Sequence, residues 1–471
     1  MNFQYYKYKF YYIIITFLLI NTAFAQIKSN IFFEKAVYME DNSSQSAEKL
    51  YRFSLEDSLF MIDEEKKIML GIDFSSYYQN SSITHYDAYN DQLQYLFSPF
   101  IHYSFFPGFN FYVRVNVENV RDQYLYKERT YWADEFRGHR GDFEIAKLTY
   151  ENKYITIKFG RDFFMPGMYP NERLIYSSYN YPYDQLKIAF HSKWFELSTY
   201  YLSLTPWKDD GISYQRHLNG HRLSFNLKYG YIALNDIMLY GGENQMIDWM
   251  AFNPLMLLYP YRKNKKHLDG NNIMSFEFYF TYWNYYIFTE WMLDDYQADN
   301  ETPVDLEPPE WGMNITLGKK QLFNNFEFKI NYSKIANRTF NAPDKDYEKF
   351  IYKNFPIGHW LANNFWEIKS SIIYADKQIY GNLTYHHYET GEEALYAPFN
   401  KDYLDYPVEV GYSEPFPFGP IRQQSGFELI CFYNFTQSLI LNFNTSYWFI
   451  HDINPNAFNV KIGLAYRLRF L

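Results

Sequence analysis

Two pairs of acidic residues and one pair of histidines have the composition that acid–base or metal chemistry needs. The carboxylates lie at positions 209–210 and 294–295, and the histidines at 386–387. Adjacent residues on a strand point to opposite faces, so neither the carboxylates nor the histidines of a pair converge. The sequence contains no H-E-x-x-H, G-x-S-x-G or P-loop motif. We therefore expect no enzyme activity, no catalytic residue, no metal and no cofactor. A hydrolase built from scattered loop residues is the alternative.

Aromatic and planar polar side chains gather in three long segments, at residues 203–219, 241–271 and 334–362. Carbohydrate recognition uses aromatic faces against sugar C–H groups and planar polar groups against hydroxyls. The segments are therefore compatible with sugar binding. The alternative is that their aromatic residues only tie long loops together. The candidate polysaccharide-binding residues are Trp207, Asp209, Asp210, Arg216, Glu243, Trp249, Arg338, His359 and Trp360.

The stretches between these loops have the period-two alternation of β-strands. In residues 457–470, apolar side chains occupy one face, while Asn, Lys, Gly, Ala and Arg occupy the other. A strand of that length invites aggregation at the edge of a soluble sheet, whereas a transmembrane barrel needs this pattern. A soluble β-sandwich is the alternative. Eighteen candidate strands lie near residues 68–79, 93–105, 108–120, 142–151, 153–161, 184–191, 194–202, 220–229, 231–240, 272–282, 285–294, 309–318, 322–333, 363–375, 378–388, 424–434, 437–450 and 457–470.

The connections between these strands alternate in length. Two-residue connections such as 106–107 and 192–193 are followed by long ones such as 121–141 and 334–362. Outer-membrane barrels have short periplasmic turns and long extracellular loops in this alternation. We therefore predict an all-β fold, a transmembrane antiparallel β-barrel of about 18 strands in the bacterial outer membrane. Its loops are expected to be extracellular and its termini periplasmic, and its lumen to be either plugged or a water-filled pore.

The start of the chain and its composition agree with export. Residues 1–25 have a basic start, an apolar run and an Ala-Phe-Ala cleavage site, which predict a signal peptide. Residues 26–67 are expected to be a periplasmic segment with a short helix, and residues 68–471 the barrel. The chain has 23% aromatic residues and one cysteine, as aromatic girdles without disulfides would produce. A net charge of −10 argues against nucleic acid as a partner. Membrane lipid and the outer-membrane assembly machinery are expected partners.

Six segments, from FGRDFFMPGMYPNERLIYSSYNYPYDQL at 159–186 to Gly-His at 358–359, follow one another along most of the mature chain. In their order and spacing they resemble the Wzi family of capsule-assembly proteins. The resemblance implies an eighteen-stranded outer-membrane barrel with periplasmic helical elements, acting as a lectin that holds capsular or extracellular polysaccharide at the cell surface. A porin for small solutes is the alternative function. Phe-Met-Pro-Gly at 164–167 and Trp-Leu-Ala-Asn at 360–363 depart from the family pattern. The matching segments are 159–186 (FGRDFFMPGMYPNERLIYSSYNYPYDQL), His-Arg-Leu at 221–223, YGGENQ at 240–245, Asn-Pro-Leu at 253–255, Asp-Asp-Tyr-Gln at 294–297 and Gly-His at 358–359.

A turn signal follows the strand that ends near residue 161. Gly160 shares a face with Lys158, which predicts that the lumen side of the strand is crowded there or is approached by another backbone segment. Arg161, Asp162 and the Met-Pro-Gly turn ending at Gly167 come next. We expect this loop to fold over the barrel mouth, with Arg161 holding it through a bidentate carboxylate contact. An exposed arginine at the rim is the alternative.

Overall fold

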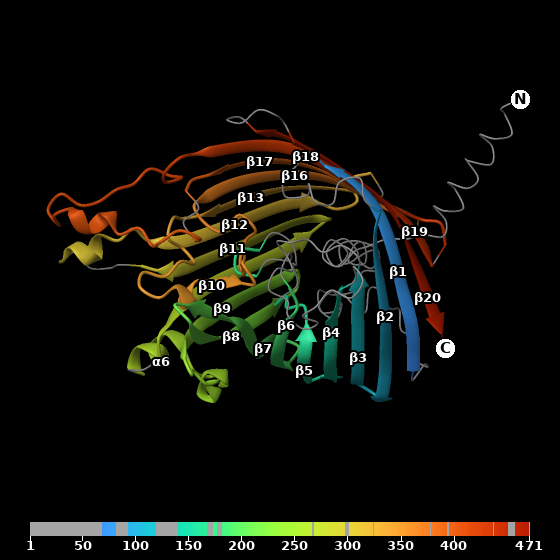
Figure 1. Ribbon diagram of the computed structural model, residues 1–471, viewed down its shortest axis with the longest axis horizontal. Coiled ribbons are helices and arrows are strands. Elements are labelled where there is room, and N and C mark those ends of the chain that lie inside the picture. Colours follow the sequence, from blue (N-terminus) through green and yellow to red (C-terminus); the bar gives the residue numbers. More distant parts are fainter. Residues whose placement is uncertain are drawn as a thin grey trace, which may run out of the picture.

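The structure is a computed structural model, and its strands form one closed, tilted wall (Figure 1). It describes residues 68–81, 93–118, 140–166, 173–176, 181–265, 268–296, 301–323, 325–376, 378–392, 395–436, 438–450 and 457–470. The predicted signal peptide and the segment 26–67 lie outside the described residues. Among the described helices, none has the length and apolar character needed to cross a membrane.

In the described part of the chain, eighteen antiparallel strands form a single sheet. Each strand pairs with its sequence neighbours, and the last pairs with the first, so the wall has no free edge. The predicted barrel and its strand number are confirmed. The strands are β1 (Ile68–Ser81), β2 (Leu93–Phe106), β3 (Phe109–Glu118), β4 (Arg140–Glu151), β5 (Ile155–Asp162), β6 (Tyr183–His191), β7 (Phe195–Asp209), β8 (Ile212–Leu227), β9 (Gly230–Glu243), β10 (Gly270–Tyr282), β11 (Tyr285–Asp295), β12 (Glu310–Lys319), β13 (Phe326–Ile335), β16 (Phe365–Ala375), β17 (Ile379–Thr390), β18 (Arg422–Asn434), β19 (Leu439–Ile450) and β20 (Ala457–Phe470).

The two faces of the wall have opposite polarity. Glu277, Glu290 and Glu367 point inward and are at most 1% exposed, whereas Ile372 and Leu383 point outward and are 48% and 44% exposed. Successive residues of a strand face opposite sides, so the alternation seen in the sequence becomes an apolar outer wall and a polar interior. An apolar exterior is stable only against lipid, which is the environment that this barrel requires.

The short turns carry a girdle of exposed aromatic side chains. Both ends of the described sheet lie with them, because Leu70 near the start of β1 is paired with Phe470 at the end of β20. Aromatic rings of this kind concentrate at the boundary between lipid and water. The short-turn end therefore defines one membrane interface. Its most exposed rings are Phe106, Tyr154, Trp194, Trp283 and Phe323.

The long connections gather at the opposite end and contain short helices (left in Figure 1). One expectation is wrong here. Residues 203–219 do not form a loop, because β7 and β8 continue outward as a hairpin and turn at Asp210-Gly211, with Asp210 at φ 45°. Period-two alternation is weak in this segment because it rises beyond the lipid-facing wall. The other elements at this end are η2 (Trp249–Phe252), α6 (Leu258–Asn264), η3 (Pro303–Leu306), η4 (Asp346–Glu348), β14 (Ile351–Tyr352), β15 (Phe355–Pro356) and η5 (Asp402–Asp405).

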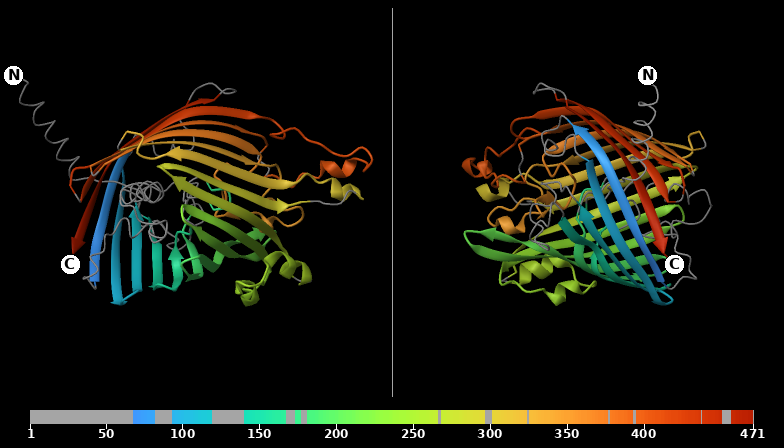
Figure 2. Two further views of the ribbon diagram at one scale, coloured as in Figure 1. Left: turned by 180° about the vertical axis from the view of Figure 1, so that it is seen from behind. Right: turned by 45° about the vertical axis from the view of Figure 1, so that its right-hand side comes forward.

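Two connections fold into the interior, and we call them the plug: residues 163–166, 173–176 and 181–182 between β5 and β6, and residues 336–364 between β13 and β16. Their apolar side chains bury against inward-facing residues of the wall and so fill part of the lumen with a packed core. From the plug this core includes Phe164, Leu174, Ile175, Tyr176, Tyr181, Phe340, Phe350, Ile351, Tyr352 and Ile357, and from the wall Tyr183, Tyr200, Leu202, Leu204, Leu218, Ile237, Leu239, Ile273, Met292, Ile335 and Phe365. The two further views in Figure 2 show the wall surrounding this interior.

The lipid-facing assignment can be tested at Leu383, near the middle of β17. Leu383→Arg should lower the free energy of unfolding by about 2–4 kcal/mol, because a charge at the bilayer midplane is desolvated. Urea titration of the barrel in lipid vesicles measures the loss. Leu383→Ala is the control, since it removes the side chain without adding charge. Equal losses in the two variants would contradict the assignment.

Candidate functional site

Buried ion pairs hold the first part of the plug to the wall. Arg173 donates two hydrogen bonds of 3.1 Å to the carboxylate of Glu277 on β10, and Arg222 of β8 lies 3.0 Å from the same carboxylate. The backbone N–H of Leu174 donates to Glu290 Oε2 at 2.6 Å. A buried carboxylate with two guanidinium partners is compensated for its lost hydration. These contacts fix residues 173–176 against the inner face.

Arg216, a predicted ligand-binding residue, holds the second part of the plug. It is buried, and its guanidinium donates to the carbonyl oxygens of Tyr347, Lys349 and Ile351 at 2.6, 2.5 and 2.9 Å. Tyr214, from the same hairpin, stacks on Tyr347 with ring centroids 4.9 Å apart. The hairpin of β7 and β8 therefore supports the plug from the side, and the role of Arg216 in this structure is to fix the loop.

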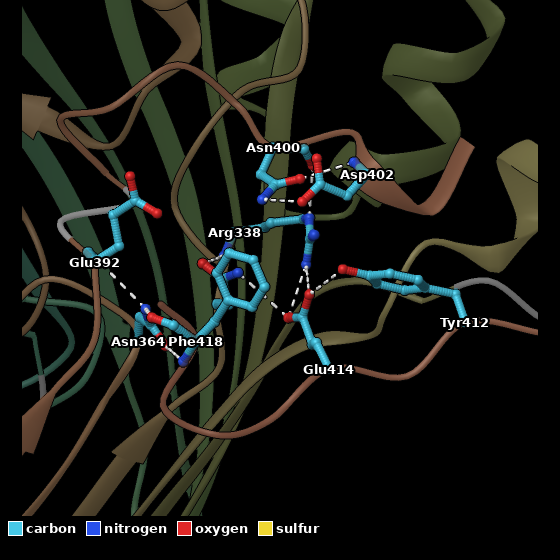
Figure 3. Close-up of polar contacts among 9 residues, drawn as sticks. Arg338, Asn364, Glu392, Asn400, Asp402, Tyr412, Glu414 and Phe418 are labelled. Carbon is cyan, nitrogen blue, oxygen red and sulfur yellow. Dashed lines mark hydrogen bonds and ion pairs between the residues drawn. The ribbon is translucent and has the colours of Figure 1, made fainter. Parts of the chain in front are cut away.

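Arg338, also predicted from the sequence, joins two loops (Figure 3). Its Nη1 lies 2.8 and 2.7 Å from the two carboxylate oxygens of Glu414, and its Nε donates to the carbonyl of Asn400 at 2.8 Å. Tyr412 donates to the same carboxylate at 3.2 Å. Arg338 is only 1% exposed. It ties the plug to the connection between β17 and β18.

Asn364 makes a second tie between the same loops (Figure 3). Its side-chain amide donates to the carbonyls of Glu392 and Phe418 at 3.1 and 2.9 Å and accepts from the N–H of Phe418 at 2.7 Å. Its φ of 58° is a left-handed conformation that asparagine tolerates better than most residues. Two polar clamps thus hold the long connection over the barrel end.

The contact predicted for Arg161 exists, but it joins strands. Arg161 forms a bidentate pair with Asp184 of the adjacent strand β6, with N–O distances of 2.7 and 2.8 Å. At Gly160, φ is 113° and a Cβ would lie 2.2 Å from the carbonyl oxygen of Ala146 on the paired strand β4, so this position has room only for glycine. Asp162 is buried and pairs with lysines of β4 and β5. Gly167 lies outside the described residues.

The remaining candidates divide between the rim and the outside of the barrel. Asp209 and Asp210 are exposed at the hairpin tip, and Trp207 lies lower on the hairpin with its ring 5.9 Å from the guanidinium of Arg216. Glu243 is exposed at the end of β9. Trp249, on η2, is 64% exposed. These residues do not form one cluster with Arg338, His359 and Trp360.

Trp360 is part of a cluster that the sequence did not reveal. Its ring meets Tyr388 edge to face at 5.4 Å, and Tyr388 meets Trp448 at 5.9 Å. His386 lies 5.3 Å from Trp448, and the ammonium group of Lys369 lies 6.0 Å from the Trp360 ring. We call these five residues the inner aromatic cluster. It combines three large rings with cationic and imidazole groups on the inner face of β16, β17 and β19.

The wall and plug both position the cluster. A Cβ at Gly426 would lie 2.5 Å from the Trp448 ring, so the absence of a side chain lets that ring lie across β18. On the plug side, His359 stacks on Phe365 at 4.5 Å and lies 3.3 Å from the carboxylate of Glu367. His359 therefore orients Trp360, its neighbour in the chain, toward the wall.

The cluster remains partly accessible. Trp360 is 36% exposed, Trp448 is half-buried, and the side chain of Glu428, near His386, is 32% exposed. Exposed ring faces beside a carboxylate are the groups that bind sugar rings and hydroxyls. The sequence does not single out Tyr388, Trp448 and Glu428, because they lie in strands whereas the predicted binding segments are loops. Their inward positions in the alternation were the available signal.

Comparisons with known proteins show the class of fold. The chain is similar to the solved structure of Wzi, described as an outer-membrane protein involved in group 1 capsule assembly in Escherichia coli and a carbohydrate-binding β-barrel. The TM-score is 0.59 and the identity 12%, over 96% of this chain and 99% of Wzi. OccK1 (OpdK) of Pseudomonas aeruginosa has a TM-score of 0.50 and 10% identity, over 86% of this chain and 99% of its own.

These likenesses identify an outer-membrane β-barrel. The sequence matches no protein-family model and no curated protein. The predicted likeness to Wzi is therefore confirmed for the fold, which the chain shares over nearly its whole length.

The clamp formed by Arg216 can be tested by limited proteolysis. Arg216→Gln leaves buried carbonyl oxygens without hydrogen-bond donors, and each costs about 1–3 kcal/mol. The equilibrium constant for local opening of the loop should therefore rise about tenfold or more. Trypsin should then cleave residues 336–364 about tenfold faster, while the heat-dependent gel shift of the barrel is unchanged. Arg422→Gln, at an exposed arginine of β18, is the control. Equal cleavage rates in both variants would refute the clamp.

The carboxyl group of Glu307 should make the docking of η3 against η5 depend on pH. Burial, together with the nearby charge of Asp295, raises the pKa of Glu307 from 4.5 to about 7, although Tyr403, Arg338 and Lys401 act in the other direction. Because the pKa is raised in the folded state, docking favours the protonated carboxyl. The contact between η3 and η5 should therefore weaken as pH rises from about 4.5 to 7.

Spin labels at Val304 and Leu404, both exposed, can report that contact by pulsed electron resonance after Cys431→Ser. The distance distribution should be narrower at pH 5 than at pH 8. In the Glu307→Gln variant the distance distribution should be narrow at both pH values, because a glutamine side chain cannot ionise. A pH effect that persists in Glu307→Gln would assign the effect to another group.

Proposed function

We propose that this outer-membrane barrel binds a capsular or extracellular polysaccharide and holds it at the cell surface, with its long loops outside the cell. The observation that carries the proposal is the inner aromatic cluster. The role is one of binding, without catalysis. The termini and short turns then lie on the periplasmic side.

The cluster has the chemistry that a sugar chain needs. The rings of Trp360 and Trp448 are partly exposed, and Tyr388 between them contacts both. Apolar faces of sugar rings pack against such aromatic surfaces, while Glu428 and Lys369 offer charged partners for hydroxyl or acidic groups. Rigid rings lose little conformational entropy on binding, since each has only two side-chain torsions.

Rigidity of the plug supports the same proposal. Trp360 belongs to the plug, which Arg216 fixes to the β7–β8 hairpin, and which Arg338 and Asn364 fix to the connection between β17 and β18. A preorganised site gains affinity because little ordering is needed on binding. The similarity to Wzi, described as a carbohydrate-binding β-barrel, agrees with this proposal.

A channel for small solutes is the competing function. Its main physical difficulty is the packed core between the plug and the wall. Planar-bilayer recordings separate the two functions. Large and stable single-channel currents from the wild-type protein would favour a channel.

The binding proposal is tested with polysaccharide prepared from the surface of the host cell. Trp360→Ala and Trp448→Ala should each weaken binding to the purified barrel by about tenfold or more, or about 1.4 kcal/mol, as expected for an aromatic anchor. Trp291→Ala is the matched control, because Trp291 is 49% exposed on the outer wall. Unchanged affinity in both cluster variants would overturn the proposal.

A further inference from the structure

The connection between β9 and β10 folds back over the outside of the barrel. We call residues 244–265 the flap. The carbonyl of Phe252 accepts a hydrogen bond from Thr199 at 2.8 Å, and the N–H of Leu258 donates to Asp236 at 2.7 Å. His221 Nε2 lies 3.1 Å from the carbonyl oxygen of Ala251. Figures 1 and 2 show α6 beyond the wall of β8 and β9.

Strand alternation places these wall residues on the outer face. Tyr200 packs into the core of the plug, so its neighbour Thr199 points outward. Asn235 donates to Glu277 in the interior, so Asp236 also points outward. The wall therefore carries polar side chains on the face that is elsewhere apolar, and the flap covers them.

In a loop surrounded by water, apolar side chains usually face the protein and polar groups face the solvent, but the flap has the opposite arrangement. Its backbone polar groups pair with the polar side chains of the wall, and Leu258 packs against Met238 and Tyr240 beneath it. Most of its other large apolar side chains are exposed on the side away from the wall. Exposed apolar residues that form a continuous patch mark a surface that meets something other than water. The patch consists of Met246 (80% exposed), Trp249 (64%), Met250 (55%), Leu255 (85%), Leu257 (63%) and Tyr259 (44%).

Two further features indicate which kind of surroundings the patch contacts. The same strands continue below it with the outward-facing Phe225, Leu234 and Met274, which are 46%, 51% and 46% exposed and belong to the lipid-facing wall. The patch also ends in basic residues of α6, including the exposed Lys263. Lys265 pairs with Asp248 at 2.5 Å, but Lys263 lies at the surface beside the Tyr259 ring. Aromatic and basic groups together are typical of the boundary between acyl chains and phosphate groups.

We propose that the flap is embedded in the membrane leaflet at the long-loop end, where Lys263 contacts phosphate groups of its lipids. The apolar side chains of the flap then replace the lipid-facing surface that Thr199, His221 and Asp236 cannot provide. The flap thus extends the lipid-facing surface of the barrel and forms a binding surface for phosphate-bearing lipid headgroups. This inference does not rest on polysaccharide binding.

The depth of the flap can be measured with a spin label at Leu257→Cys, in a chain that carries Cys431→Ser. In phosphatidylcholine vesicles the label should be relaxed by oxygen, which dissolves in lipid, more than by a water-soluble nickel chelate. Phe276→Cys on the outer wall is the lipid reference, and Ile212→Cys at the hairpin tip is the aqueous reference. If the label at Leu257 is relaxed by oxygen and by the nickel chelate in the same proportion as the label at Ile212, the proposal is overturned.

The headgroup contact is tested in vesicles with and without lipid A, which carries phosphate. Added lipid A should reduce the access of the nickel chelate to the label at Leu257, by about twofold or more. Lys263→Glu should abolish this difference, whereas Lys228→Glu, at the short-turn end, should preserve it. An unchanged response in Lys263→Glu would refute the phosphate contact. Dipolar broadening between Leu257 labels would show instead that a second copy covers the flap, and would also overturn the proposal.

Discussion

Closure of the sheet between β1 and β20 is the constraint on which the rest of the structure depends. Lipid offers no hydrogen-bonding groups, so every backbone N–H and C=O of the wall must be paired within it. At the seam, Arg467 lies 2.6 Å from Asp73. Asp73 also lies 3.2 Å from Arg114, which in turn lies 3.0 Å from Glu144. This inward-facing chain of charges joins the first and last strands to β3 and β4.

A polar interior is the consequence of an apolar exterior in a closed sheet. Because alternate residues face inward, the lumen receives charges whose hydration is lost once the plug enters. The structure compensates that loss locally, as in the carboxylate of Glu277 between Arg173 and Arg222. The same guanidinium chemistry fixes the other plug segment, where Arg216 and Arg338 bind carbonyl oxygens and Glu414. The plug is therefore held by directional contacts around an aromatic core.

Polar side chains on the outer face of the wall also need hydrogen-bond partners. Thr199 and Asp236 point toward the side that elsewhere meets lipid, and each finds a backbone partner in the flap. One sheet thus has the two connections of the plug folded inside it and the flap folded against its outer surface. The inner loop presents Trp360 to the wall, whereas the outer loop presents Trp249 away from it.

The sequence by itself determined the barrel, because period-two alternation is a local property of each strand. It placed all eighteen strands and separated the apolar face of residues 457–470 from the face that carries Lys and Arg. It could not show that residues 203–219 continue as a hairpin, since no alternating apolar pattern is required beyond the lipid. Nor could it bring Trp360 to Tyr388, the neighbour of Trp448, because that contact depends on how a plug loop enters a closed barrel. Arg216 and Arg338 are buried for the same reason: their partners belong to distant loops, and only the tertiary structure decided which loops meet.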